Sequence, residues 1–561
     1  MQSDKGADMR VKAWPWRISQ ALAVIIPLAY IVMYTPYGMD TTDFGFFYGY
    51  AWRIVQGDIP YRDFYYINPS LPLFWHALWI KLTPASWGIL GGKLGFVASM
   101  LGTAWLTALY LNKVFDLRRM GVPVSLLATT GFVWGVHTFA HVPWHTVDGA
   151  LFASGALYAG ACGLPLAAGV LACMAMLTKQ SFLLIPLGVA VSVYALRGSR
   201  GEALRVLAVC ALGWAGLWAF LHYVDAWQAF RLLTSKPLDI REALEAGIYI
   251  YVRQEWWLPA LALVPWLVWR LRFRGRPCPE LMQPALVYLT ILAVRYMHHV
   301  GMTRTWQGFG ESWPTLWLVL GGLCVLLPTL FLRPWLREAS GRYPLWRASA
   351  ALGAAVLVSW SVGISGGYKT PALYAVPLVF ALLLTHARLG GRPVIAAWTA
   401  LVLGLLMFRV GYEYPYTFPI RQLSRSALTY DAGAVFPKAS GVLVDREMFE
   451  TLRELRDLRA RYGARYRVLP GFPHAYFLTD DKPAFPSEWL MDWQIAHQFD
   501  EVYQQLLDSG VTVFMLRDQM DTVQADGYAR AGYTVPQMVR KRWRVVEETP
   551  HFVVMRPPLG K

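Results

Sequence analysis

The chain has 561 residues, of which 56% are hydrophobic and 16% are charged, and it contains 26 Trp. Repeated apolar runs of about 17–25 residues match the thickness of a bilayer core, which excludes an ordinary soluble protein for most of the chain. The net charge of +16 falls mostly in short hinges between these runs, so it indicates membrane orientation and predicts no nucleic-acid partner.

The first apolar run, Ile18–Tyr34, follows a basic segment that carries Lys5, Arg10, Lys12 and Arg17. This arrangement resembles a signal peptide, but the run is long and no small-residue cleavage pattern follows it. We therefore predict an uncleaved first helix. Its amino end is expected in the cytoplasm, because Lys and Arg favour that side of the membrane.

The next segment, residues 37–84, is more aromatic than a simple connection between two spans requires. Asp40 and Asp43 precede a helix-like run over residues 44–55, and a second apolar run opens at Pro69. The apolar stripe of the first run has helical spacing, which is typical of a helix that lies in the membrane interface. We interpret the segment as a first outer (periplasmic) loop with interfacial helices.

Clusters of Lys and Arg orient the remaining apolar runs, and the alternation gives about thirteen spans with the tail outside. The runs with clear ends in the sequence are Trp87–Leu111, Pro123–His137, Asp148–Gly163, Pro165–Leu177, Phe182–Arg197, Val206–Tyr223, Trp256–Trp269, Ala285–Ala293, Trp313–Leu332 and Val394–Met407. The predicted fold is thus a polytopic α-helical membrane protein whose membrane module covers residues 1–409.

After residue 409 the composition becomes that of a soluble domain, and the pattern of residues 410–561 is typical of an α/β fold. Strands are predicted at Val442–Val444, Tyr466–Leu469 and Val511–Leu516, helices at Met448–Arg461 and Phe499–Ser509, and a closing hairpin at Trp543–Val546 with Phe552–Met555. The thirteen-span count places this domain in the periplasm.

Asp43 is the first candidate for chemistry. A carboxylate at the outer bilayer surface, partly desolvated by Phe and Tyr neighbours, has its pKa raised toward the range useful for a general base. The alternative is that Asp43 caps the helix that follows, with Asp40 as a solvated neighbour. One residue can do both.

Lys179 is an exception to the charge bias, because the short fifth span ends at residues 177–180 and places Lys179 on the outer side. A Lys at membrane depth costs roughly 2.5–3.5 kcal/mol on insertion scales, which favours a functional purpose. The alternative is that its side chain extends to the interface, where the ammonium stays hydrated.

Three histidines, His137, His141 and His145, recur at intervals of four residues beside Asp148. This spacing fits metal ligation on one helical face, although Pro143 interrupts the face. The default interpretation is that these histidines pack at the interface, and a divalent metal on His141 and His145 is the alternative. Asp148 either caps the fourth span or orients an acceptor.

Several short motifs resemble the GT-C superfamily of bacterial glycosyltransferases, relatives of protein O-mannosyltransferases and of the lipid A aminoarabinose transferase. The residues that carry the resemblance are Asp43-Phe44-Gly45, Tyr50-Ala51, Arg53-Ile54, Gly57, Pro60–Phe64, Pro69, Leu177–Gln180, Tyr476–Thr479 and Lys482-Pro483. One position departs from the family pattern, since many members carry an Asp-Glu pair where this chain has Asp43-Phe44.

The resemblance implies a transferase that takes a sugar from a polyprenyl-phosphate carrier at the outer face of the inner membrane. Asp43 would then be the general base that accepts the proton of the acceptor hydroxyl. The departing phosphate needs cations, and the candidates on the outer side are Lys179 and Arg62, followed by Arg253 and Arg304. For Arg253 and Arg304, contact with lipid headgroups or a surface ion pair is the alternative.

Three further residues are candidates to contact the acceptor or to support the residues that contact it, namely Asp40, Asp148 and His298. His298 is also expected to lie near the donor phosphate. The expected partners are a polyprenyl-phosphate-linked sugar, membrane lipid and an acceptor that is a glycan, a lipid or a protein. No cofactor is predicted beyond the alternative of a divalent metal.

Three other functions fit a protein with many membrane spans. A transporter or flippase for lipid-linked sugars predicts a cationic cavity reachable from both faces and does not need a large outer tail. An envelope assembly protein would use the tail alone. A polymerase or ligase that moves whole oligosaccharides is closest in chemistry to the predicted transferase.

Overall fold

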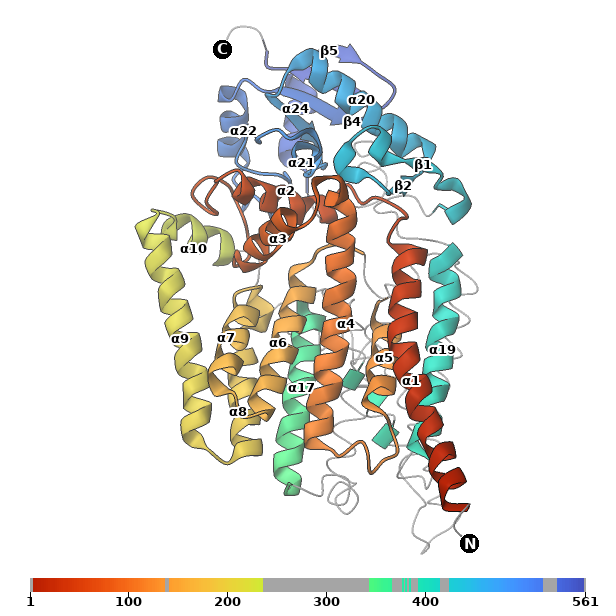
Figure 1. Ribbon diagram of the computed structural model, residues 1–561. Helices are drawn as coiled ribbons and strands as arrows, with labels where there is room; N and C mark the ends of the chain where they lie inside the picture. The colour runs from red at the N-terminus through yellow and green to blue at the C-terminus, as the bar shows by residue number, and fades with distance from the viewer. Residues whose placement is uncertain are drawn as a thin grey trace, which may run out of the picture.

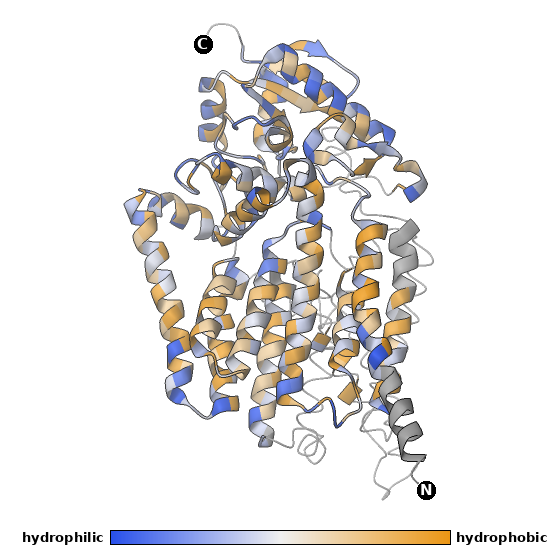
Figure 2. Ribbon diagram, viewed as in Figure 1, coloured by the Kyte–Doolittle hydropathy of each residue, from blue (hydrophilic) through white to orange (hydrophobic). Residues whose placement is uncertain are grey.

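The computed structural model describes residues 4–136, 141–235, 343–365, 392–413, 423–517 and 532–558, together with the pairs 376–377, 379–380 and 383–384. A bundle of helices forms one end of the molecule and a small α/β domain forms the other (Figure 1). The helices α2 (Asp43–Val55) and α3 (Leu71–Leu82) lie between them. Hydrophobic residues dominate the bundle, whereas hydrophilic residues are frequent in the tail domain (Figure 2).

The helices of the bundle follow the apolar runs of the sequence. They are α1 (Asp4–Tyr34), η1 (Ala85–Trp87), α4 (Gly88–Val114), α5 (Val124–Val136), α6 (His145–Ala161), α7 (Pro165–Met176), η2 (Gln180–Phe182), α8 (Ile185–Arg197), α9 (Arg200–Tyr223), α10 (Trp227–Ser235), α17 (Leu345–Ser365) and α19 (Pro393–Glu413). The predicted runs within residues 18–223 are confirmed as helices, with α8 preceded by the short turn η2.

Among the described residues, four helical stretches are long and apolar enough to cross a membrane. They are Trp16–Tyr34, Ala85–Val114, Gln180–Arg197 and Arg200–Tyr223. The predicted spans between residues 256 and 332 lie outside the described residues. The count of about thirteen spans therefore stays a prediction.

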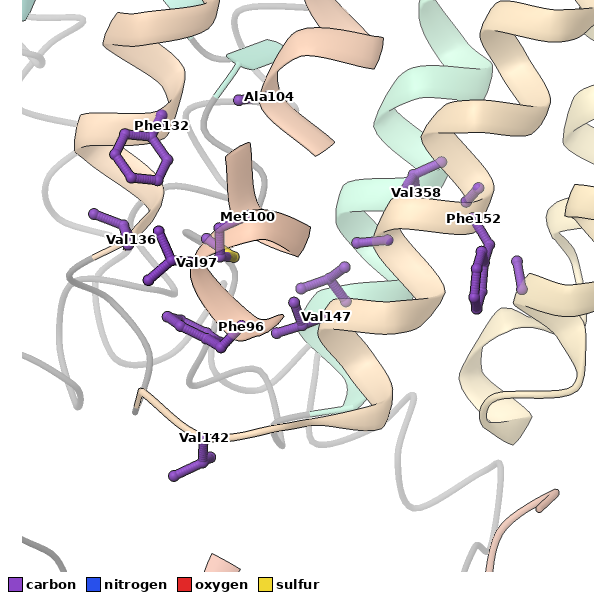
Figure 3. Close-up of a cluster of buried hydrophobic side chains, with 14 of the residues drawn as sticks. Phe96, Val97, Met100, Ala104, Phe132, Val136, Val142, Val147, Phe152 and Val358 are labelled. Atoms are coloured by element: carbon purple, nitrogen blue, oxygen red, sulfur yellow. The ribbon is translucent and has the colours of Figure 1, made fainter. Parts of the chain in front are cut away.

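Side chains from four helices meet in the core of the bundle (Figure 3). Phe96 and Met100 come from α4, Phe132 from α5, Phe152 from α6 and Val358 from α17. All five are almost fully buried. Lipid tails are as apolar as these side chains, so the core is stabilised by close van der Waals packing more than by exclusion of water.

The tail domain contains a four-stranded sheet in the order β3-β4-β6-β5, in which only β3 and β4 run parallel. Its elements are η5 (Arg425–Ala427), β1 (Tyr430–Asp431), η6 (Ala432–Ala434), η7 (Pro437–Ala439), β2 (Leu443–Val444), α20 (Arg446–Tyr462), β3 (Tyr466–Leu469), α21 (Ala475–Thr479), α22 (Phe499–Asp508), β4 (Thr512–Leu516), α24 (Thr534–Arg542), β5 (Arg544–Glu548) and β6 (Phe552–Arg556). The predicted strands, both predicted helices and the closing hairpin are confirmed.

The helix of the first outer loop is not placed as the sequence predicted. An interfacial helix would leave one face against lipid headgroups, but α2 is buried at every residue from Phe44 to Arg53. The prediction failed because the tail domain covers the face of α2 that points away from the bundle. An aromatic helix that packs on both sides needs apolar residues all round.

Two glycines allow α2 to contact the tail at backbone distance. A Cβ atom on Gly45 would lie 2.3 Å from Nδ1 of His474, and one on Gly49 would lie 2.7 Å from the carbonyl oxygen of Pro473. Residues four apart share one face of a helix, so both glycines face the same segment of the tail. A side chain larger than a hydrogen atom at either position would push α2 and the tail domain apart.

We predict that Gly49→Ala destabilises the protein by about 1–3 kcal/mol, because the new methyl group meets a backbone carbonyl that cannot rotate away. Gly216→Ala in α9 is the matched control, since nothing lies within 4 Å of a Cβ at that position. Thermal unfolding of the purified protein measures both. Equal melting temperatures for the two variants would contradict the close contact.

Candidate functional site

The two acids at the start of α2 have different roles. Asp40 is 4% exposed and accepts hydrogen bonds from the backbone N–H groups of Thr42 (2.8 Å) and Phe44 (2.9 Å). These bonds satisfy amide groups at the first turn, so Asp40 caps α2. The interpretation of Asp43 as the cap and Asp40 as a solvated neighbour was wrong, because the chain before α2 folds back over the helix end.

Asp43 is left available for chemistry. Its side chain is half-buried, and within the described part of the chain its carboxylate makes no hydrogen bond. Burial and the negative charge of Asp40 raise the pKa of Asp43 well above its usual range. Burial also raises the pKa of Asp40 to about 6, against the opposing effect of its hydrogen bonds.

A buried lysine near Asp40 stabilises the chain that leads into α2, and the sequence analysis missed it. Lys93 of α4 donates hydrogen bonds to the carbonyl oxygens of Tyr37 (2.8 Å) and Gly38, and its charge interacts with that of Asp40. It thereby fixes the chain that leads into α2. A lysine within an apolar helix was the signal that could have revealed it.

A second group of polar side chains lies where α2, α3 and the start of α6 meet. His76 Nε2 lies 2.9 Å from Asp148 Oδ2, although the approach is too oblique for a hydrogen bond. The ring of Phe47 lies 6.0 Å from that of His76 and 5.0 Å from that of His145. His145 also stacks on Trp144 at 5.3 Å, and the ring of Trp144 lies 5.3 Å from that of Phe47.

Asp148 therefore does not cap α6 through its side chain. It lies in the first turn of that helix and faces His76 across the contact between α6 and α3. The spacing argument for a cap failed because the helix begins at His145, three residues earlier than the sequence predicted.

Lys179 lies between α7 and η2, next to the segment that joins α2 to α3, and its predicted place on the outer side of the membrane stays a prediction. The adjacent Gln180 donates a hydrogen bond to the carbonyl oxygen of Ile67 at 2.9 Å. Burial lowers the pKa of His145, and the neighbouring positive charge of Lys179 lowers it further. Burial also lowers the pKa of Lys179 to about 8, so its ammonium group is mostly protonated at neutral pH.

The structure says less about the other residues that were predicted to bind phosphate or acceptor. Arg62 is exposed, and its guanidinium forms two hydrogen bonds with Asp63 at 2.9 and 2.8 Å. Arg253, Arg304 and His298 lie outside the described residues. The role of each in phosphate or acceptor binding stays a prediction.

The histidine series is divided between two environments. His141 is hydrogen-bonded to the hydroxyl of Tyr30, whereas His145 packs against Phe47 and Trp144. Within the described ranges, no group of three or more His, Cys, Asp or Glu side chains could hold a metal ion. His137, the first of the series, lies outside these ranges.

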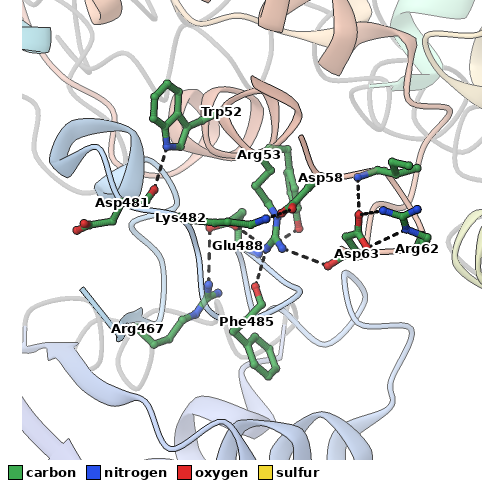
Figure 4. Close-up of polar contacts among 12 residues, drawn as sticks. Trp52, Arg53, Asp58, Arg62, Asp63, Arg467, Asp481, Lys482, Phe485 and Glu488 are labelled. Carbon is green, nitrogen blue, oxygen red and sulfur yellow. Dashed lines mark hydrogen bonds and ion pairs between the residues drawn. The ribbon is translucent and has the colours of Figure 1, made fainter. Parts of the chain in front are cut away.

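A buried network of charges joins α2 to the tail domain (Figure 4). Arg53 donates to Asp58 at 2.9 Å and to Glu488 at 3.1 Å. Arg467 approaches the other oxygen of Glu488 at 3.7 Å, and Lys482 pairs with Asp58 at 2.6 Å. Burial raises the pKa of Glu488, and the two arginines oppose this rise.

The chain matches no family model and no curated protein. The solved structures that it resembles include two of ArnT from Cupriavidus metallidurans. The apo structure has 15% identity and a TM-score of 0.38, and the structure bound to undecaprenyl phosphate has 14% identity and a TM-score of 0.39. Each likeness covers 97% of this chain and 98% of that chain.

ArnT is a lipid A aminoarabinose transferase and a GT-C glycosyltransferase. Both TM-scores lie below 0.5, so neither likeness assigns a function to this chain.

We predict that Arg53→Met destabilises the protein by about 3–5 kcal/mol, because it leaves the carboxylate of Glu488 buried beside an uncharged side chain. Adding Glu488→Gln should recover part of the loss by removing that charge. Arg456→Met is the control, since Arg456 forms an exposed pair with Asp457 and its loss should cost less than about 1 kcal/mol. Denaturant titration of the three variants measures the differences, and equal values for the two single variants would refute the argument.

Proposed function

We propose that the protein is a GT-C type glycosyltransferase that moves a sugar from a polyprenyl-phosphate carrier to an acceptor hydroxyl at the outer face of the inner membrane. The observation that carries this proposal is the state of Asp43. Asp43 lies half-buried at the junction of bundle and tail, and its carboxylate makes no hydrogen bond to a described residue and has a raised pKa.

The chemistry assigns one task to each charged group. Asp43 accepts the proton of the acceptor hydroxyl, and the oxygen then attacks the anomeric carbon of the sugar. The bond between that carbon and the phosphate oxygen breaks, and the carrier leaves as the lipid phosphate. Lys179 neutralises the charge that develops on the phosphate. Attack from the face opposite the leaving group inverts the anomeric configuration.

The surrounding residues suit Asp43 to this task. Asp40 is held as the helix cap, so its negative charge stays close to Asp43 and favours proton uptake. Lys93 fixes the chain before α2 from the side of the bundle. The tail packs on α2 through Trp52, whose indole N–H donates to the carbonyl oxygen of Asp481 at 3.0 Å. This cover limits access of water to the base.

The core of the bundle favours an enzyme over a flippase. A flippase needs a polar path for a phosphate between the two faces of the membrane. The described helices α4, α5, α6 and α17 instead meet mostly through apolar side chains (Figure 3), and polar contacts such as Thr107 with Ser154 are satisfied within the bundle. The lipid-linked donor would therefore reach the site sideways from the bilayer.

We predict that Asp43→Asn lowers sugar transfer by about 10²–10⁴-fold, the usual effect of losing a general base. The measurement is transfer of label from total lipid-linked sugars in membranes that contain the variant. Asp457→Asn, an exposed acid of the tail, should keep full activity. Unchanged transfer by Asp43→Asn would remove the base assignment.

The same prediction has a pH dependence. Only the ionised carboxylate of Asp43 accepts a proton, so the rate falls as the pH drops through its raised pKa. Asp40→Asn removes the neighbouring negative charge while keeping an oxygen that can cap α2. The pKa of Asp43 should then fall, and the acid limb of the rate profile should move to lower pH. An acid limb that stays in place would show that another group titrates.

A further inference from the structure

We infer that the polar side chains gathered around Phe47 form the site for the sugar of the lipid-linked donor. In this site His145, Asp148 and Tyr48 contact the hydroxyl groups of the sugar. The inference rests on the proposed function and names the residues that bind the sugar of the donor.

The first observation is a concentration of buried polar atoms without partners. Both ring nitrogens of His145 and the hydroxyl of Tyr48 make no hydrogen bond to any described residue, and Nε2 of His76 and Oδ2 of Asp148 have only each other, at 2.9 Å without a hydrogen bond. All four side chains are at most 5% exposed. Buried polar groups in native proteins are almost always paired, so a group of them in one place indicates a ligand that supplies the missing partners.

These atoms belong to one cluster although they come from three helices. Tyr48 of α2 lies 6.3 Å from His76 of α3, measured between rings. His76 approaches Asp148 of α6 at 2.9 Å, and Phe47 contacts both His76 and His145. The cluster therefore lies directly beneath α2.

The mixture of donors and acceptors indicates the chemistry of the ligand. A tyrosine hydroxyl donates and accepts, a neutral imidazole offers one nitrogen for each role, and an ionised carboxylate only accepts. A phosphate, which mainly accepts, would be repelled by Asp148. Sugar hydroxyl groups both donate and accept, so they can satisfy every member of the cluster.

The position of the cluster is also right for the donor. The positive charge of Lys179, the proposed phosphate ligand, reaches His145. Asp43 and Phe47 are four residues apart on α2, so they lie on the same face one turn apart. A sugar bound at Phe47 would therefore have its phosphate next to Lys179 and its anomeric carbon toward Asp43.

The test compares lipids with and without a sugar, using the purified full-length protein in nanodiscs. The probes are undecaprenyl phosphate and the same lipid carrying glucose, galactose, mannose or aminoarabinose. The wild-type protein should bind at least one sugar-bearing lipid about tenfold more tightly than the bare lipid, as expected for added hydrogen bonds. Tyr48→Phe and Asp148→Asn should each remove most of this preference and leave binding of the bare lipid unchanged.

A stability measurement separates a ligand site from an ordinary buried network. Tyr48→Phe removes a hydroxyl without a partner, so it should leave the melting temperature of the empty protein unchanged or raised. Tyr110→Phe is the matched control, because the Tyr110 hydroxyl is paired with Ser192 at 2.7 Å and donates to the carbonyl oxygen of Ala351 at 2.8 Å. This control should lower the melting temperature and keep the sugar preference.

The outcomes distinguish failure of the inference from failure of the proposed function. The inference is overturned if wild-type protein binds bare and sugar-bearing lipids equally, if the variants keep the preference, or if Tyr48→Phe destabilises as much as Tyr110→Phe. These results leave the proposed function standing if the wild-type protein still binds the bare lipid and Lys179→Ala weakens that binding. Absence of binding to every probe would refute both.

Discussion

The contact between Arg53 and Glu488 is the interaction on which the rest of the site depends. It joins a helix of the first outer loop to a segment more than 400 residues later in the chain, and both side chains are almost fully buried. Taking such charges out of water is costly, so the contact is stable only while every partner stays in place. The loop and the tail consequently form one unit, which holds α2 in a fixed position above the bundle.

That fixed position explains the properties of the two acids. Because α2 is enclosed by the bundle and the tail, the carboxylates at its start are desolvated, and desolvation is the main cause of their raised pKa values. The hydrogen bonds that Asp40 accepts stabilise its ionised form, whereas Asp43 lacks such bonds among the described residues. Two similar acids three residues apart thus become a helix cap and the proposed general base.

The sequence predicted those features that depend on local pattern. The strand at Tyr466–Leu469 and the helix near Met448 follow from periodicity. It did not predict features that depend on contacts between distant segments. The enclosure of α2 and the pairing of Arg53 require knowledge of where the tail packs, and no local pattern contains that information. Lys93 is different, because its place in an apolar helix was visible.

The histidines show how a spacing argument can fail and still mark a functional region. Four-residue intervals place side chains on one face only within a continuous helix, but α5 ends at Val136 and α6 begins at His145. His141 therefore packs against Tyr30, while His145 joins Asp148 and His76 beneath α2. Polar residues concentrated at one level of a membrane protein are costly whether or not they share a helix face. Their cost indicated a site, and the mixture of donors and acceptors in the cluster carries the proposal that it binds hydroxyl groups.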